Sequence, residues 1–294
     1  MVRHPVRISL ALGFIVALGL TADAGAAETP KQLVMAVTPS NIPTELFKAS
    51  EAFAVELGKK LGLSIKVYMP TDYLGVVEAL RNKTADMAFV HPAGYVFSNQ
   101  EAKAQIVAVD VWHGKTNYTS RFFVRKDSGF KRLEDLRGKN IAFVDPGSTS
   151  GYVYPMVMLI KKGLVKDRDP KTFFKEAMFA GTHEAALLAL LNGSVDAVAS
   201  FDLAPQQYLK EKERVEKLIY IAETDPIPEA GMCVREGLDP ALVKRIHDAL
   251  MAFNAPEYRS ILKDFYGIDG FAPAKDSDYN PVREAIDLLG WRPR

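Results

Sequence analysis

The residues best suited to chemistry stand together in one stretch, Asp145 to Tyr152, whose sequence is DPGSTSGY. Three consecutive hydroxyl residues, Ser148, Thr149 and Ser150, follow a Pro-Gly turn and precede a helical pattern, where a helix N-cap is expected. The first N–H groups of a helix lack partners within it, and the helix dipole adds partial positive charge. We therefore predict that residues 148–150 form an anion-binding helix start, called the anion seat below. Ordinary helix capping is the alternative interpretation.

Several other chemistries are disfavoured by the same sequence. No Lys follows Gly151, so the phosphate-gripping charge of a nucleotide P-loop is missing. Ser, His and Asp occur in an order that a hydrolase triad can have, but the G-x-S-x-G elbow is absent from this stretch. His91 and His113 have no nearby Cys or His at metal-ligand spacing. We therefore expect no cofactor and no metal, and an enzyme is the least favoured function.

Strands that alternate with helices must position the anion seat. An apolar run at 141–144 predicts a buried strand before it, and residues 153–162 predict a helix after it. The N-terminal half shows the same alternation, which is typical of βαβ units and a parallel sheet. The strands expected there are 33–37, 65–68 and 86–90, and the helices are 44–61 and 71–81.

The two halves of the chain are similar to each other. At an offset of 110 residues, Asn82 corresponds to Asn192 and Asp86 to Asp196, within matching apolar surroundings. Such internal similarity predicts two lobes of one architecture. The same offset places Tyr73 opposite His183, each just inside the start of its lobe's second helix.

Composition and the N-terminus limit location and partners. Lys plus Arg number 37 and Asp plus Glu 36, so nothing points to nucleic acid. A basic start, an apolar segment and small residues predict a signal peptide at 1–27, cleaved after Ala26 or Ala27, and export to the periplasm. The only cysteine, Cys233, cannot form an intramolecular disulfide and is interpreted as a packing residue.

Two extended segments, 118–125 and 230–235, are expected to cross between the lobes. The helical tail, residues 240–262 and 282–289, is expected to return to the first lobe. The first lobe would then comprise residues 28–117 plus 231–294, and the second lobe residues 118–230.

These motifs resemble those of the phosphonate- and phosphite-binding proteins of ABC importers. The similarity covers nearly the whole mature chain, and its most specific segments are 145–151, GTHE at 181–184 and DYLG at 72–75. It implies an α/β, two-lobed periplasmic-binding-protein fold of type II, with a hinge and a ligand cleft. It also implies that the anion seat donates to phosphorus oxygens, with Tyr73 and His183 closing around them.

Eight residues form the predicted binding site, because they fall at the carboxyl ends of strands or at helix starts in both halves, or belong to segments that carry the resemblance. They are Tyr73, Tyr95, Tyr118, Ser148, Thr149, Ser150, His183 and Asp202. Packing is the alternative role for the tyrosines, and capping for His183 and Asp202. HPAG at 91–94 departs from the Gly-Pro-x-Ser that often precedes the cleft tyrosine, and Asp202 is chosen only for following a predicted strand. His91, Trp112 and His113 are interpreted as structural.

The predicted function is capture of a small phosphorus oxyanion by a monomeric periplasmic protein that delivers it to an ABC permease. The candidate ligands are phosphite, methylphosphonate, an aminoalkylphosphonate and phosphate. We expect the Asp202 carboxylate to accept a hydrogen bond from a protonated ligand oxygen, which sulfate lacks. A sensor that presents the oxyanion to a membrane histidine kinase is the alternative, and a hydrolase is less favoured.

Overall fold

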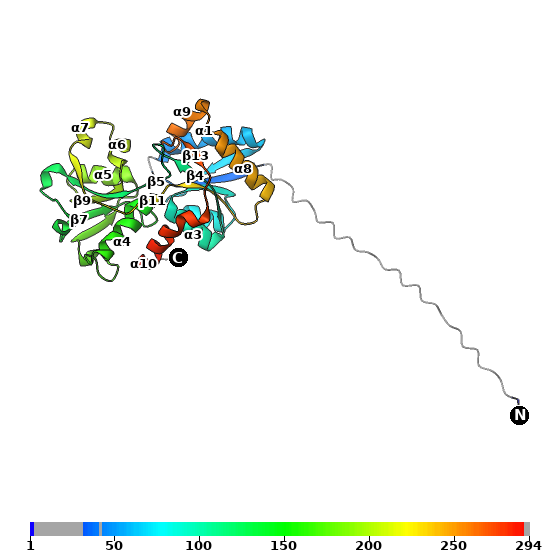
Figure 1. The fold of residues 1–294 in the computed structure, drawn as a ribbon, viewed down its shortest axis with the longest axis horizontal. Coiled ribbons are helices and arrows are strands. Elements are labelled where there is room, and N and C mark those ends of the chain that lie inside the picture. Colours follow the sequence, from blue (N-terminus) through cyan, green and yellow to red (C-terminus); the bar gives the residue numbers. More distant parts are fainter. Residues whose placement is uncertain (3–31, 41–42, 291–294) are drawn as a thin grey trace.

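The structure is a computed structural model that describes residues 1–2, 32–40 and 43–290. Apart from Met1 and Val2, the predicted signal peptide lies outside the described residues. Two mixed sheets, each covered by helices, lie side by side and form two lobes (Figure 1). Within the described part of the chain, no helix is both long and apolar enough to cross a membrane.

The first lobe is built on a six-stranded sheet in the order β13-β4-β12-β3-β1-β2. Strand β1 runs parallel to β2 and β3, as alternating βαβ units predict, whereas β12 is antiparallel to β3 and β4. The strands are β1 (Gln32–Val37), β2 (Ser64–Tyr68), β3 (Met87–Val90), β4 (Gln105–Val111), β12 (Gly231–Val234) and β13 (Gly270–Ala272). The helices are α1 (Pro43–Leu61), α2 (Gly75–Arg81), α3 (Pro92–Ala102), α8 (Pro240–Ala252) and α9 (Arg259–Asp264).

The second lobe is built on a five-stranded sheet in the order β10-β6-β9-β7-β8. Its strands are β6 (Ser120–Arg125), β7 (Asn140–Phe143), β8 (Glu176–Phe179), β9 (Ala197–Phe201) and β10 (Leu218–Glu223). Its helices are the π-helix η3 (Thr149–Val153), α4 (Tyr154–Lys161), α5 (His183–Leu191), α6 (Ala204–Tyr208) and α7 (Lys212–Val215). Short 3-10 turns complete the chain: η1 (Lys126–Ser128), η2 (Leu133–Leu136), η4 (Pro170–Thr172), η5 (Pro256–Tyr258) and η6 (Asp276–Tyr279).

The internal similarity predicted from the sequence is confirmed by two equivalent hydrogen bonds. The Asp86 carboxylate accepts from the main-chain N–H of Val34 at 2.9 Å, and the Asp196 carboxylate accepts from that of Asn140, also at 2.9 Å. Each acid precedes a parallel strand and binds the start of the neighbouring one. The repeated Asp therefore ties together the same pair of strands in both lobes.

A short antiparallel ladder carries the chain between the lobes. Strand β5 (Asn117–Tyr118) pairs with β11 (Ile227–Pro228). The predicted extended segments at 118–125 and 230–235 are confirmed as extended, but most of each belongs to a sheet. The crossing itself lies at the start of the first segment and just before the second.

The C-terminal helix α10 (Asn280–Leu289) contacts both lobes. The tail was expected on the first lobe, and α8, α9 and β13 do pack there. Helix α10 packs on α3 of the first lobe and also on α4 and η3 of the second, and it lies between the two bodies in Figure 1. Its buried side chains, Val282, Ala285, Ile286 and Leu289, join a core that spans both lobes.

Cys233 is fully buried on β12, as its interpretation as a packing residue predicts. Strand β12 lies between β4 and β3 in the first sheet, and its thiol belongs to the core cluster that also holds Ala88, Tyr95 and Tyr279. Burial raises the pKa of this thiol to about 12, which leaves it protonated and unreactive at neutral pH.

Candidate functional site

A cavity lies where the two lobes meet. Its volume is about 70 Å³. Since a single water molecule needs roughly 10–15 Å³, this space suits a small tetrahedral anion with a short substituent. The lining residues come from both lobes and from the crossing strands: Ser40, Phe89, His91, Asp110, Trp112, Tyr118, Ser148, Thr149, Ser150, His183, Phe201, Gln207, Tyr208, Glu229, Ala230, Tyr266 and Ile268.

The anion seat forms one wall of the cavity, and its three hydroxyl residues are buried. Strand β7 leads into the Pro-Gly turn, and the helix begins as predicted, although its first turn is a π-helix. The Ser148 hydroxyl caps this turn by accepting from the Gly151 N–H at 3.0 Å. Gly151 is required here because a Cβ atom would lie 2.4 Å from the Val144 Cβ. Ser148, Thr149 and Ser150 all line the cavity, and the Ser148 hydroxyl, which only accepts in this cap, keeps its hydrogen available for donation.

Thr149 also joins the two lobes directly. Its Oγ1 accepts a hydrogen bond of 2.9 Å from the main-chain N–H of Ala93, at the start of α3 in the first lobe. A hydroxyl that accepts from one side keeps its own hydrogen free to donate to another group. The lobe contact thus leaves the Thr149 hydroxyl able to donate to an oxyanion.

His183 lines the cavity and does not cap its helix. The Thr182 hydroxyl caps α5 instead, by accepting from the Ala185 N–H at 3.1 Å. The His183 Nδ1 lies 2.6 Å from the Ser200 hydroxyl, which fixes the orientation of the ring. Burial, reinforced by His91, lowers the pKa of His183 to about 3. His183 is therefore a neutral imidazole at neutral pH.

His91, which the sequence analysis interpreted as structural, lines the same cavity. It follows β3 and occupies the N-cap position of α3, so it reaches the cavity from the first lobe. Its Nε2 is buried and has no hydrogen-bond partner among the described residues. Burial lowers the pKa of His91 to about 4. The ring that faces His183 from the other lobe is therefore a second neutral imidazole.

Of the three predicted tyrosines, one lines the cavity and two do not. Tyr118 lines the cavity. Its pKa is raised, mainly because the side chain is buried and to a smaller extent because the Glu229 carboxylate is near. Tyr73 precedes α2, contrary to the prediction that it lies inside that helix, and does not line the cavity. Its ring stacks on His91 with 5.6 Å between ring centroids, and its buried hydroxyl has no hydrogen-bond partner among the described residues. Tyr73 thus packs against His91.

Tyr95 lies outside the cavity. It is fully buried on α3, and its hydroxyl donates to the Asp276 carboxylate at 2.6 Å. Its ring lies 4.6 Å from that of Tyr279, centroid to centroid. These contacts account for the whole side chain, because both its ring and its hydroxyl are bound within the first lobe.

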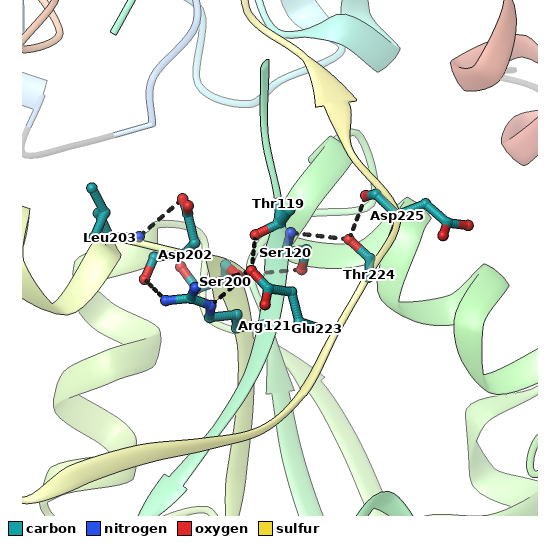
Figure 2. Close-up of polar contacts among 9 residues, drawn as sticks. All are labelled: Thr119, Ser120, Arg121, Ser200, Asp202, Leu203, Glu223, Thr224 and Asp225. Atoms are coloured by element: carbon teal, nitrogen blue, oxygen red, sulfur yellow. Dashed lines mark hydrogen bonds and ion pairs between the residues drawn. The ribbon is translucent and has the colours of Figure 1, made fainter. Parts of the chain in front are cut away.

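Asp202 also lies outside the cavity lining. Its carboxylate accepts from the adjacent Leu203 N–H at 3.1 Å, and its main-chain carbonyl accepts from Arg121 at 3.2 Å. Arg121 in turn forms an ion pair with Glu223 at 3.0 Å, so this network binds β6, β9 and β10 together (Figure 2). Thr119 adds a hydrogen bond to Glu223 at 2.5 Å. The capping alternative therefore describes the contacts of Asp202 better than the predicted ligand contact.

Two carboxylates that the sequence analysis did not identify line the cavity instead. Asp110 is the last residue but one of β4, Glu229 follows β11, and both are buried. Burial raises the pKa of Asp110 and, together with Asp110, that of Glu229. None of the described residues that line the cavity is a Lys or an Arg. Nor does the described part of the chain contain a group of three or more His, Cys, Asp and Glu able to hold a metal.

The site can therefore enclose a small oxyanion between neutral donors. Hydroxyl groups and imidazoles aimed at one point stabilise charge in a water-poor space without a formal positive charge. The aromatic rings of Trp112, Phe201 and Tyr208 form part of the remaining wall and exclude water. The two acids add an acceptor region to the same cavity.

The chain is similar along most of its length to proteins with known roles. It is 27% identical over 279 residues to the phosphate-import protein PhnD of Mycolicibacterium smegmatis, covering 89% of this chain and 87% of that protein. It is 28% identical over 273 residues to the phosphonates-binding periplasmic protein of Escherichia coli, covering 90% of this chain and 79% of that one.

Solved structures show the same fold. PhnD1 from Prochlorococcus marinus, in complex with methylphosphonate, aligns with a TM-score of 0.79 and 21% identity. The alignment covers 89% of this chain and 99% of that structure. The family model described as "ABC transporter, phosphonate, periplasmic substrate-binding protein" matches residues 35–279. With a match across most of its length, the chain belongs to the family of periplasmic substrate-binding proteins of phosphonate ABC transporters.

Proposed function

We propose that the interlobe cavity of this protein binds a small phosphorus oxyanion, a phosphonate or phosphite, and that the protein delivers it to an ABC permease. The observation that carries the proposal is the anion seat, a helix start with three buried hydroxyl residues that opens into a cavity lined by both lobes. The three hydroxyl groups of the anion seat and His183 would donate to the phosphorus oxygens. The names of the relatives support the same class of ligand.

Ligand capture would proceed by closure of the two lobes. The first lobe comprises residues 28–117 plus 231–294 and the second residues 118–230, with α10 shared between them. Because a ligand in the cavity contacts both lobes, its differential contacts favour the closed arrangement. The Ala93–Thr149 hydrogen bond forms only when the lobes meet, so the anion seat reaches its final geometry on closure.

Asp110 and Glu229, rather than Asp202, would supply the acceptors that discriminate between anions. A buried carboxylate accepts hydrogen bonds, so it tolerates a ligand that brings an O–H or N–H group and repels bare sulfate. Phosphonates, phosphite and phosphate ionise a second time near neutrality and can carry such a hydrogen. Sulfate cannot.

The protein would act as an exported, monomeric binding protein without catalytic activity or nucleic-acid partners. Its signal peptide would be removed after Ala26 or Ala27, which the intact mass of the secreted protein tests. Retention of residues 1–20 would contradict this. A role in presenting the ligand to a sensor kinase is the second candidate, and a kinase gene beside this one, in place of permease and ATPase genes, would favour it.

A calorimetric panel tests the ligand. The purified protein is titrated with phosphite, methylphosphonate, an aminoalkylphosphonate, phosphate and sulfate at one pH and ionic strength. We expect tight binding of at least one phosphorus oxyanion and no heat from sulfate. Equal binding of sulfate, or no binding of any phosphorus oxyanion, would overturn the proposal.

A further inference from the structure

The strongest unexplained feature of the molecule is a pair of buried acids in the cavity. Asp110 is 3% exposed to solvent and Glu229 is 7% exposed. One carboxylate oxygen of each is buried without a hydrogen-bond partner among the described residues. An unpaired buried carboxylate is strongly unfavourable when it is charged. The two acids therefore need either a proton or a partner that the protein itself does not provide.

The two acids belong to neighbouring segments, and both line the same cavity. The Asp110 N–H donates to the carbonyl of Ala230, the residue after Glu229, at 2.9 Å, and both acids line the cavity. The titratable groups that act on the pair are Tyr118, Tyr279 and Asp202, none of which is a cation. No Lys or Arg of the described residues forms an ion pair with either acid.

Two such carboxyl groups titrate together. Burial disfavours charge on each, and each carboxylate disfavours charge on the other, so both pKa values are raised. The charge on the pair then follows whatever occupies the cavity. Hydrocarbon beside the pair favours added protons, while a cation favours their loss.

Building on the proposed function, we propose that Asp110 and Glu229 form a second subsite, the acid pair, that adjusts its charge to the substituent on phosphorus. With an uncharged alkyl substituent, the pair holds one proton more than with an ammonium substituent. When an ammonium group enters, one carboxyl O–H breaks, its proton passes to the buffer, and the carboxylate accepts an N–H from the ligand. When an alkyl group enters, the carboxyl groups keep that proton, and the pair buries one negative charge fewer.

This exchange gives the two kinds of ligand different pH dependences. Binding an ammonium-bearing phosphonate competes with a proton for the acid pair, so its affinity relative to the alkyl ligand rises with pH. After correction for the ionisation of the free ligands, the ratio for one exchanged proton approaches a tenfold rise per pH unit across the range in which the pair titrates. One site thereby accepts both ligand classes without burying an uncompensated charge.

The test uses ethylphosphonate and aminoethylphosphonate, which differ in one ammonium group. Calorimetry in buffers of different ionisation enthalpy counts the protons exchanged on binding, after the ionisation of each free ligand is measured separately. We expect wild-type protein to release about one proton more with aminoethylphosphonate. In the double variant D110N/E229Q the two ligands should exchange equal numbers of protons, and aminoethylphosphonate should lose affinity much more than ethylphosphonate.

The control is Asp202→Asn, the same change of acid to amide outside the cavity, which should keep the wild-type difference. Equal proton counts for the two ligands in wild-type protein, or a difference that persists in the double variant, would overturn the acid pair. Should the double variant fail to fold, a pH-independent affinity ratio in the wild-type protein overturns it just as well. Failure of both phosphonates to bind would instead contradict the proposed function.

Discussion

Thr149 offers the sharpest test of the anion seat, because its hydroxyl has two roles. It accepts from the Ala93 N–H at 2.9 Å, and it would donate to the bound anion. Thr149→Val keeps the shape of the side chain and removes the hydroxyl. Losing a hydrogen bond to a charged group costs about 1.5–3 kcal/mol, which corresponds to a roughly 10- to 150-fold weaker Kd.

The same change also weakens closure of the lobes. With Val at position 149, the Ala93 N–H is buried against a methyl group when the lobes meet, which costs about 1–3 kcal/mol. That penalty falls on the closed state and adds to the loss of affinity. Thr149→Ser retains the hydroxyl, so we expect it to recover most of the binding.

Isothermal titration with the tightest ligand of the panel measures these changes. The matched control is Thr172→Val, which removes a hydroxyl from the same lobe. The Thr172 hydroxyl bonds only locally, to the main chain of Lys166 and Asp169. The Thr172→Val substitution should lower the melting temperature but leave Kd unchanged. If Thr149→Val binds as tightly as Thr172→Val, the anion seat does not hold the ligand.

Three further predictions concern closure, discrimination and pH. Gly147→Ala places a Cβ 2.9 Å from the Tyr73 Cβ across the lobe contact. We therefore expect weaker binding and, by small-angle scattering, less compaction on ligand addition. Compaction equal to that of the wild-type protein would contradict this. Asp202→Asn should change ligand affinity by no more than about twofold and leave sulfate excluded; sulfate binding in this variant would restore Asp202 as the discriminating group. Because burial depresses the pKa of His183 to about 3, the unfolded state takes up its proton first as pH falls below about 6.5, and stability is lost by up to about 1.4 kcal/mol per pH unit. Melting temperature should therefore fall more steeply from pH 6.5 to 4.5 in wild-type protein than in His183→Gln, and equal slopes would show that His183 is not buried as a neutral ring.

The elements around the anion seat were predictable because local rules determine them. An apolar strand, a Pro-Gly turn and a run of hydroxyl residues specify a strand, a turn and a helix start wherever they occur. The repeated Asp at positions 86 and 196 likewise revealed two similar lobes, since each lobe ties its strands together in the same way. Each of these signals occupies only a few consecutive residues of the sequence.

The far wall of the cavity depends on contacts between distant segments. Asp110 lies in the apolar strand sequence QIVAVDV, and an acid in such a run was a signal that it is buried for a reason. His91 follows a strand and precedes a helix, the same position that identified Ser148, so it too could have been recognised. Glu229 carries no such pattern, because only the β5–β11 crossing brings it to the cavity. Tyr95 and Asp202 had suitable positions, but the Tyr95 hydroxyl donates to Asp276 and the Asp202 carboxylate accepts from the Leu203 N–H.

Chemical modification of the Cys233 thiol can report local unfolding of the first lobe. The sulfur is fully buried in a core cluster and its pKa is about 12, so a thiol reagent reacts only when the packing around β12 opens. The rate of modification, compared with that of a free thiol, then measures the free energy of opening the first lobe without any label. Its dependence on ligand concentration distinguishes two modes of opening. If the logarithm of the modification rate falls with a slope of one against the logarithm of ligand concentration, β12 opens only after the ligand has left. If the rate does not depend on ligand concentration, the strand opens with the ligand still in place.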